Sequence, residues 1–237
     1  MTKPRVLVLI SGSGSNLQAL IDSVAGKRSP QIPAEICAVI SSSPTAYGLT
    51  RAKTAGIAAE VHDLQKYYKD IPKEDKDARK QARKKFNVDL AELVLKQKPD
   101  LIVCAGWMLI LSPSFLNPVS KVNVPIINLH PALPGQFAGI HAIERAWEAG
   151  QRGEITKGGL MIHRVIKEVD EGEPLVVKEL ELKKEETVEE YETRVHENEH
   201  IAIIEGTILA LKEIEQKSSD KETELPKLES LAISESK

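Results

Sequence analysis

The residues of this chain that are best able to do chemistry stand at the end of a short apolar run, Pro125 to Pro131. Asn128 and His130 are two positions apart, and side chains with that spacing in a strand point to the same side. Pro131 cannot donate to a sheet ladder, so it marks the strand's end. Open α/β sheets bind ligands beyond the carboxyl ends of their strands. We therefore expect a reactive amide and imidazole there, although such a pair can also form only a satisfied turn.

A second chemical feature is the glycine-rich segment Ser11 to Asn16, which follows the apolar run Arg5 to Ile10. Such a loop leaves backbone N–H groups free at a helix N-terminus, where the helix dipole also favours an anion. The segment is expected either to bind a phosphate or to be a well-capped turn, since Ser and Asn are good N-caps. It is not a Walker loop, because no Gly-Lys-Ser/Thr follows, and Leu17 replaces the third glycine of the dinucleotide fingerprint.

The composition of the 237 residues is that of one folded domain: 41% are hydrophobic and 28% are charged. The formal net charge of −3 gives no overall basic field of the kind that nucleic acid or an anionic membrane attracts. Cys37 and Cys104 lie in apolar runs, which indicates neither a disulfide framework nor a metal site. No apolar run approaches transmembrane length or resembles a signal sequence. We expect a cytoplasmic protein that binds no metal, nucleic acid or membrane.

The elements that must position these residues alternate between buried apolar runs and helical patterns, which is typical of an α/β protein. Strands are predicted at 5–10, 35–40, 58–62, 100–105 and 125–130, and an antiparallel hairpin at 158–167 and 175–180. Helices are predicted from 17, at 47–55, up to 98, at 140–149 and from 187, while 65–85 reads as a solvated loop and exposed helix face. The predicted fold is an open, mostly parallel, Rossmann-like sheet flanked by helices, with an antiparallel C-terminal extension. Residues 217–237 lose periodicity and are predicted to be a disordered tail.

Five motifs make the chain similar to the monofunctional, folate-dependent phosphoribosylglycinamide formyltransferases of purine biosynthesis. They are VLISGSGSNLQALID from Val8, AGWMLILSPSFL from Ala105, INLHPALPG from Ile127, HRVIKEVDEGEP from His163 and RVHENEHIAI from Arg194. Five motifs in the family's order and spacing are far more specific than one. The resemblance, which covers about residues 5–211, implies the formyltransferase fold over 1–216, with a phosphate-binding half to about 104 and a folate-binding and catalytic half from about 105.

The resemblance also implies a role for each matching residue. The catalytic positions are Asn128, His130 and Asp170. The positions for the phosphate and ribose of the substrate are Gly14, Ser15, Asn16, His196 and Glu199, and those for the folate are Arg83, Met108, Leu109, Ile110 and Leu111. Leu109 stands where many members carry arginine, so only backbone contacts to the folate are expected at that point.

The implied reaction transfers a formyl group from 10-formyltetrahydrofolate to the amine of glycinamide ribonucleotide. Attack of the amine gives a tetrahedral intermediate with a negative oxygen and a positive nitrogen. Asn128 can donate to that oxygen, and His130, with an ordinary pKa near 6.5, can move the proton. Asp170 is expected to orient the imidazole and raise its pKa. His163 is expected to be a supporting core residue.

Other readings share part of this pattern. A methionyl-tRNA formyltransferase or a formyltetrahydrofolate hydrolase also has the Asn-x-His-Pro core, but the former is expected to add a basic C-terminal domain and the latter an N-terminal one. A non-catalytic nucleotide-binding module would keep the loop at 12–16 and lose turnover. The intact Asn128, His130 and Asp170 argue against it. The oligomeric state is left open.

Overall fold

The strands form a single sheet in the computed structural model, which describes residues 2–234, with side chains through residue 220. Their order is β3-β2-β1-β4-β5-β6-β7. The strands are β1 (Arg5–Ile10), β2 (Glu35–Ser41), β3 (Ala59–Val61), β4 (Leu101–Cys104), β5 (Ile126–His130), β6 (Lys157–Arg164) and β7 (Pro174–Glu181). The first five run parallel, and β6 and β7 are antiparallel to their neighbours. The predicted fold class is confirmed.

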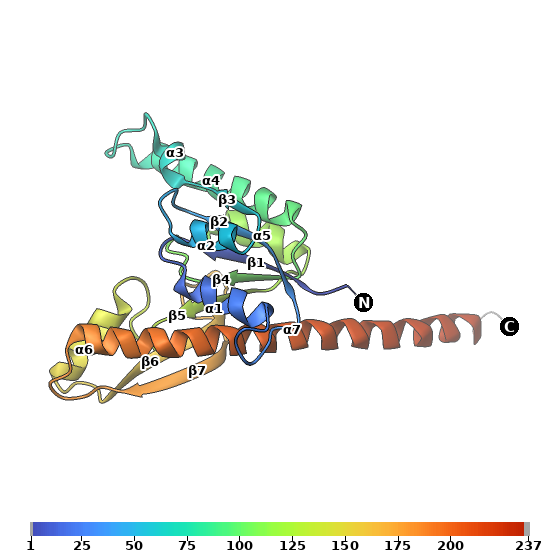
Figure 1. Cartoon of the computed structure of the whole chain (residues 1–237). Helices are drawn as coiled ribbons and strands as arrows, with labels where there is room; N and C mark the ends of the chain where they lie inside the picture. The colour runs from blue at the N-terminus through green and yellow to red at the C-terminus, as the bar shows by residue number, and fades with distance from the viewer. Residues whose placement is uncertain (1, 235–237) are drawn as a thin grey trace.

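Helices cover both faces of the sheet, so the central strands are apolar on both sides. The helices are α1 (Ser15–Val24), α2 (Gly48–Thr54), α3 (Leu64–Tyr68), α4 (Lys76–Lys96), α5 (Pro113–Lys121), α6 (Ala142–Gln151) and α7 (Val188–Ser234). Alternate residues of β1 belong to different cores: Val6 and Val8 pack with α1 and α7, whereas Leu7 and Leu9 pack with α4 and α5. In Figure 1, α4 accordingly lies near the top and α7 runs along the bottom.

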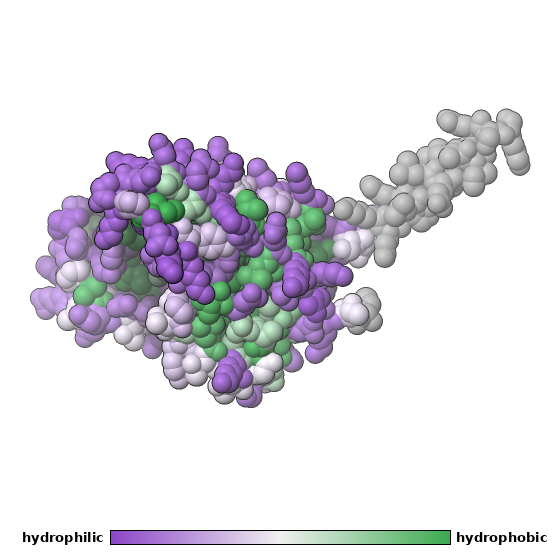
Figure 2. Space-filling view, turned by 90° about the horizontal axis from the view of Figure 1, so that it is seen from above, coloured by the Kyte–Doolittle hydropathy of each residue, from purple (hydrophilic) through white to green (hydrophobic). Residues whose placement is uncertain are grey.

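The charged stretch 65–85 faces solvent, as predicted, through α3 and the first half of α4. Figure 2 views the molecule from above and shows mainly hydrophilic residues over that region, with hydrophobic residues gathered between them. α4 turns inward only from Phe86 onward, where Leu90 and Val94 enter the core. The change from a charged to an apolar face along one helix explains why the sequence pattern there looked partly like a loop.

Two helices were not predicted. No helix was predicted at residues 113–121, where two prolines in nine residues argue against one. Pro113 occupies the start of α5, where its missing N–H costs nothing. Pro118 removes one helical hydrogen bond, and the full burial of Phe115 and Val119 offsets that loss. The short α3 was not recognised, because most of it lies within the charged stretch 65–85.

The C-terminal tail also differs from the prediction. α7 continues through Ser234, so residues 217–234 are helical rather than irregular, and 235–237 lie outside the described residues. The helix projects beyond the sheet (Figure 1). Apolar periodicity indicates packing against the core, so it gives no signal for a helix that projects away from the sheet. No helix in the described part of the chain, α7 included, is long and apolar enough to cross a membrane.

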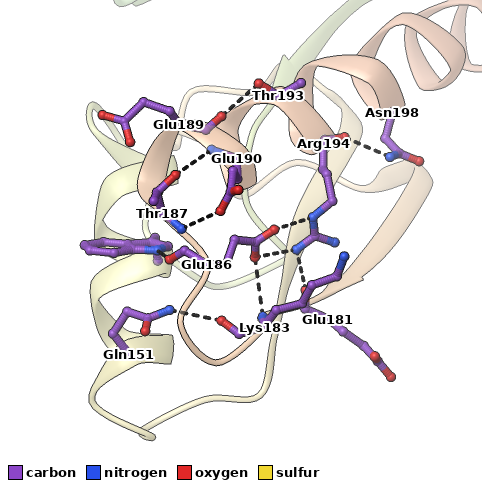
Figure 3. A network of polar contacts seen from close by, with 11 residues as sticks. Gln151, Glu181, Lys183, Glu186, Thr187, Glu189, Glu190, Thr193, Arg194 and Asn198 are labelled. Atoms are coloured by element: carbon purple, nitrogen blue, oxygen red, sulfur yellow. Dashed lines mark hydrogen bonds and ion pairs between the residues drawn. The ribbon is translucent and has the colours of Figure 1, made fainter.

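A polar network fixes the start of α7 (Figure 3). Thr187 and Glu190 form a reciprocal capping box: the Glu190 N–H donates to Thr187 Oγ1 at 3.2 Å, and the Thr187 N–H donates to Glu190 Oε2 at 2.9 Å. Arg194 donates to both carboxylate oxygens of buried Glu186, at 2.6 and 2.7 Å. The Trp147 Nε1–H donates to the Glu186 carbonyl oxygen at 2.7 Å. These contacts fix the register of the helix that carries one wall of the site.

Candidate active site

A cavity of about 930 Å³ opens at the carboxyl ends of β1, β4 and β5. The chain leaves β1 towards β2 on one side, and it returns through β4 to β5 on the other. The helix after β1 therefore packs on one face of the sheet, and the helix after β4 packs on the opposite face. A crevice at this switch point is the general ligand site of open α/β sheets. All thirteen positions singled out from the sequence line this cavity.

The loop after β1 offers free backbone donors to an anion. Gly14, which precedes α1, has a left-handed backbone with φ of 69°. Among the described residues, no N–H group of residues 12–16 donates to a protein acceptor. These groups lie at the N-terminus of α1, where the helix dipole adds positive potential. The arrangement suits a phosphate group.

The other end of this subsite comes from α7. Asn16 Nδ2 donates to Glu199 Oε2 at 3.0 Å, whereas Asn16 Oδ1 is buried and has no partner among the described residues. Glu199 is only 5% exposed, and burial raises the pKa of its carboxyl group. His196, one turn earlier, is partly exposed at the cavity. Residues more than 180 positions apart thus form one polar surface.

The amide of Asn128 is oriented by a neighbouring strand. β6 pairs His163 with Asn128 in register. The His163 Nδ1 lies 2.9 Å from the carbonyl oxygen of Arg164, which can only accept, so Nδ1 carries the proton. His163 Nε2 then accepts from Asn128 Nδ2 at 3.1 Å. One amide N–H of Asn128 is held in this way, and the second is left to donate to a ligand.

Asp170 lies between the two imidazoles. Its Oδ2 is 3.5 Å from His130 Nδ1, and its Oδ1 is 3.5 Å from His163 Nε2. The Gly139 N–H donates to Oδ2 at 2.9 Å. Asp170 itself has φ of 58°, a left-handed conformation that Asp tolerates better than most residues. The structure therefore brings Asn128, His130 and Asp170 together, and it places His163 within the same hydrogen-bonded group.

The electrostatics of this group correct one expectation. Burial lowers the pKa of His130 below its ordinary value, and the negative charge of Asp170, which acts in the raising direction, does not overcome it. Asp170 thus acts in the expected direction, but the burial that lowers the net pKa of His130 was not anticipated. For Asp170, burial favours a higher pKa, but the hydrogen bond from the Gly139 N–H and the positive charge that His130 carries when protonated both favour the carboxylate, and the pKa is lowered. At neutral pH the pair is a neutral imidazole beside a carboxylate.

The free nitrogen of His130 is the reactive atom of the group. Its Nδ1 faces Asp170, whereas its Nε2 is buried and has no hydrogen-bond partner among the described residues. A buried nitrogen lone pair that lacks a donor is costly unless a ligand supplies one. His130 is therefore arranged to accept a proton from a bound molecule.

The wall formed by residues 108–111 is apolar and open. Met108 is 72% exposed and Ile110 is 57% exposed, whereas Leu111 is buried behind them. Large exposed apolar side chains at a cavity rim are typical of a ligand surface. Leu109 also lines the cavity, and Arg83 reaches it from α4 without an ion-pair partner among the described residues. An open, partly apolar surface of this kind suits an apolar ring system.

Some residues of the cavity were not singled out from the sequence. Glu192 lies four positions before His196 on α7, and that spacing places both on one face of a helix. Ile140, which is 70% exposed, extends the apolar rim. Helical spacing could have found Glu192, but nothing in the pattern around Ile140 marks it. Among the described side chains, no group of three or more His, Cys, Asp or Glu could hold a metal ion.

Known proteins share this fold and sequence. Residues 4–207 match the protein family described as "Formyl transferase". The phosphoribosylglycinamide formyltransferase of Saccharomyces cerevisiae is 55% identical over 89% of this chain and 98% of its own length. The protein of the same name from Schizosaccharomyces pombe is 47% identical over 85% and 94%. The solved structure of glycinamide ribonucleotide transformylase 1 from Symbiobacterium toebii has a TM-score of 0.71 and 32% identity, and the match covers 86% of each chain.

Proposed function

The chain belongs to the formyl transferase family, as its motifs predicted, and on that premise we propose that it formylates the amine of N1-(5-phospho-D-ribosyl)glycinamide from 10-formyltetrahydrofolate. The yeast relatives that bear the name of this activity match the chain over nearly their whole length. One observation carries the mechanistic part of the proposal. The unpartnered Nε2 of His130 belongs to the same cavity as the anion loop, residues 11–16 after β1, and the apolar wall of residues 108–111.

The ribonucleotide substrate is bound at the β1 end of the cavity. Its phosphate accepts from the free N–H groups around Gly14, Ser15 and Asn16, and no side-chain cation is needed for that contact. The hydroxyl groups of its ribose form hydrogen bonds with Glu199 and His196 on α7. A buried carboxylate with a raised pKa suits hydrogen bonding to neutral hydroxyls.

The chemical step depends on the group around His130. The neutral imidazole accepts the proton from the attacking amine at Nε2, and the Asp170 carboxylate stabilises the imidazolium that results. The second N–H of the Asn128 amide donates to the oxygen of the formyl carbon as negative charge develops on it. The same His130 proton then passes to the departing folate nitrogen. His163 acts in this scheme by holding Asn128 in its donating orientation.

The folate co-substrate is bound along the wall formed by residues 108–111. Met108 and Ile110 provide exposed apolar surface, and Arg83 provides a cation for an acidic group at the rim. The Met108 N–H donates to Ser11 Oγ at 2.9 Å, so this wall is tied directly to the anion loop. The co-substrate supplies the formyl group, and the chain supplies its position beside His130.

The experiment that tests the proposal is a folate-difference absorbance assay with the full chain. We expect turnover with the phosphoribosyl substrate, negligible turnover with water or methionyl-tRNA as acceptor, and none for His130→Ala. Formate release without the amine would indicate the hydrolase reading. Tight binding of the ribonucleotide without any turnover would indicate a binding module, and either result would refute the proposal.

A further inference from the structure

The anion loop is held from outside by α2, an element that has no part in the mechanism above. Two successive carbonyl groups of the loop point towards this helix. The Gly48 N–H donates to the Gly12 carbonyl oxygen at 3.1 Å, and Arg51 Nε donates to the Ser13 carbonyl oxygen at 2.9 Å. Gly48 is the first residue of α2, and Arg51 lies one turn later on the same helix.

These two contacts decide where the loop's own N–H groups point. A trans peptide unit is planar, so its N–H points opposite to its C=O. Because the carbonyl groups of Gly12 and Ser13 face α2, the N–H groups of Ser13 and Gly14 are turned away from it. Both residues line the cavity, and neither N–H donates to an acceptor among the described residues.

The Arg51 side chain is itself held in place. Its Nη1 donates to Gln18 Oε1 at 3.2 Å, and Gln18 Nε2 donates to Asp22 Oδ1 at 3.0 Å, both on α1. The guanidinium also lies over the Tyr47 ring, 5.0 Å from its centroid. The planar guanidinium holds these two acceptors in a fixed geometry, which the small, freely rotating ammonium of lysine does not reproduce.

Direct backbone packing supports the same arrangement. A Cβ atom on Gly14 would lie 2.6 Å from the Gly48 Cα, and one on Gly48 would lie 2.5 Å from Ile10 Cδ1. The two glycines thus allow α2 to approach the loop closely enough for the Gly48 N–H to reach its acceptor.

We propose that Gly48 and Arg51 are positioning residues that hold the loop in its anion-binding conformation before the ligand arrives. Order that exists in the free protein does not have to be created on binding, so affinity rises without a direct contact to the ligand. The inference rests on the proposed function for the identity of the anion, but not for the binding of an anion.

The test compares Arg51→Met with Arg51→Lys and with Lys53→Met, a control on the same helix. Lys53 is exposed, and its side chain forms no hydrogen bond or ion pair with the described residues. Inorganic phosphate is titrated while the backbone amide signals of Ser13 and Gly14 are followed by NMR. We expect Arg51→Met to weaken phosphate binding about tenfold, the effect of one hydrogen bond to a charged group, and Lys53→Met to leave it unchanged. Arg51→Lys should recover only part of the loss.

Steady-state kinetics provide a second readout. Arg51→Met should raise KM for the ribonucleotide by about the same tenfold factor, while kcat and KM for the formyl donor stay within about twofold. If Arg51→Met does not fold, Gln18→Leu, which frees only Nη1, should give a smaller loss of the same kind.

Three results would overturn the inference. They are unchanged phosphate binding in Arg51→Met, equal losses in Arg51→Met and Lys53→Met, and full recovery in Arg51→Lys, which would show that charge alone matters. Failure of the proposed function is distinguishable. In that case no formyl transfer is seen, yet phosphate still shifts the Ser13 and Gly14 signals in a manner that depends on Arg51.

Discussion

Replacement of Asp170 by Asn tests the central electrostatic argument. Asn has the shape of Asp and can still accept the Gly139 N–H, but it removes the negative charge that lies 3.5 Å from His130 Nδ1. Burial already lowers the pKa of His130, and the carboxylate is the main opposing influence. In the variant the pKa of His130 should therefore fall further, and the imidazolium that forms during proton transfer should lose its counter-ion.

The size of the effect follows from Coulomb's law. Two unit charges about 4 Å apart interact by about 4 kcal/mol at an effective dielectric constant of about 20. If all of that stabilisation were lost in the transition state, the rate would fall by roughly a thousandfold, since each 1.36 kcal/mol is about tenfold. Relaxation of the site reduces the loss, so we expect kcat/KM to fall by about 30- to 1000-fold.

The assay is the pH dependence of kcat/KM for formyl transfer, measured by the folate absorbance change. A base with a lower pKa stays deprotonated to lower pH, so the acid limb of the profile should move to lower pH in Asp170→Asn. NMR titration of the His130 ring follows the same change directly. Glu171→Gln is the matched control, because it removes an equal charge from the adjacent position, where the side chain is exposed and forms no hydrogen bond or ion pair with a described residue.

The reasoning is refuted if folded Asp170→Asn keeps kcat/KM within about twofold of the wild-type value, well below the loss that a Coulomb contact at this distance supplies. It is also refuted if the acid limb stays in place or moves to higher pH. A loss of similar size in Glu171→Gln would show that the general negative potential of this turn matters, and not the contact with His130.

Three further substitutions test other parts of the structure. Gly14→Ala forces an alanine into φ of 69° and against the Gly48 backbone, so the free energy of unfolding should fall by about 2 kcal/mol and KM for the ribonucleotide should rise. The pKa of Glu199 is raised in the folded chain, so the free energy of unfolding of the wild type should fall as pH rises above the pKa of the unfolded chain, about 4.3. Glu199→Gln lacks this titration, so its stability relative to the wild type should increase over the same pH range. Arg194→Met leaves the carboxylate of Glu186 unpaired and should cost about 2 to 3 kcal/mol of stability.

Denaturant unfolding measures all three, and each has a clear contrary outcome. Gly12→Ala is the control for the first, since its added Cβ meets nothing within 4 Å, and equal losses in both variants would contradict the packing argument. A difference between Glu199→Gln and wild type that does not change between pH 4 and pH 8 would contradict the second. Arg152→Met breaks only two exposed ion pairs, with Glu148 and Glu154, so it should change little. An equally small effect of Arg194→Met would sink the third.

The local sequence determined the strands and the chemical types at their ends. The run at 5–10 was identified to the residue, because a strand buried on both faces must be apolar throughout. The position of Asn128 and His130 on the same side of β5 also followed from strand geometry alone. By contrast, α5 was missed because the hydrogen bond lost at Pro118, inside the helix, is offset by the burial of Phe115 and Val119, a tertiary effect.

Which residues surround Asn128 and His130, and the direction in which the pKa of His130 shifts, were decided only by the tertiary structure. The antiparallel register of β6 made His163 the partner of Asn128, and the left-handed turn at Asp170 brought its carboxylate to His130. The net direction of the His130 pKa depends on burial, which no local pattern reports. The contact between α2 and the anion loop was likewise invisible in the sequence, because it joins residues more than thirty positions apart. A sequence carries the chemical type of each side chain, whereas distance and dielectric environment, which set the strength of electrostatic contacts, exist only in the folded chain.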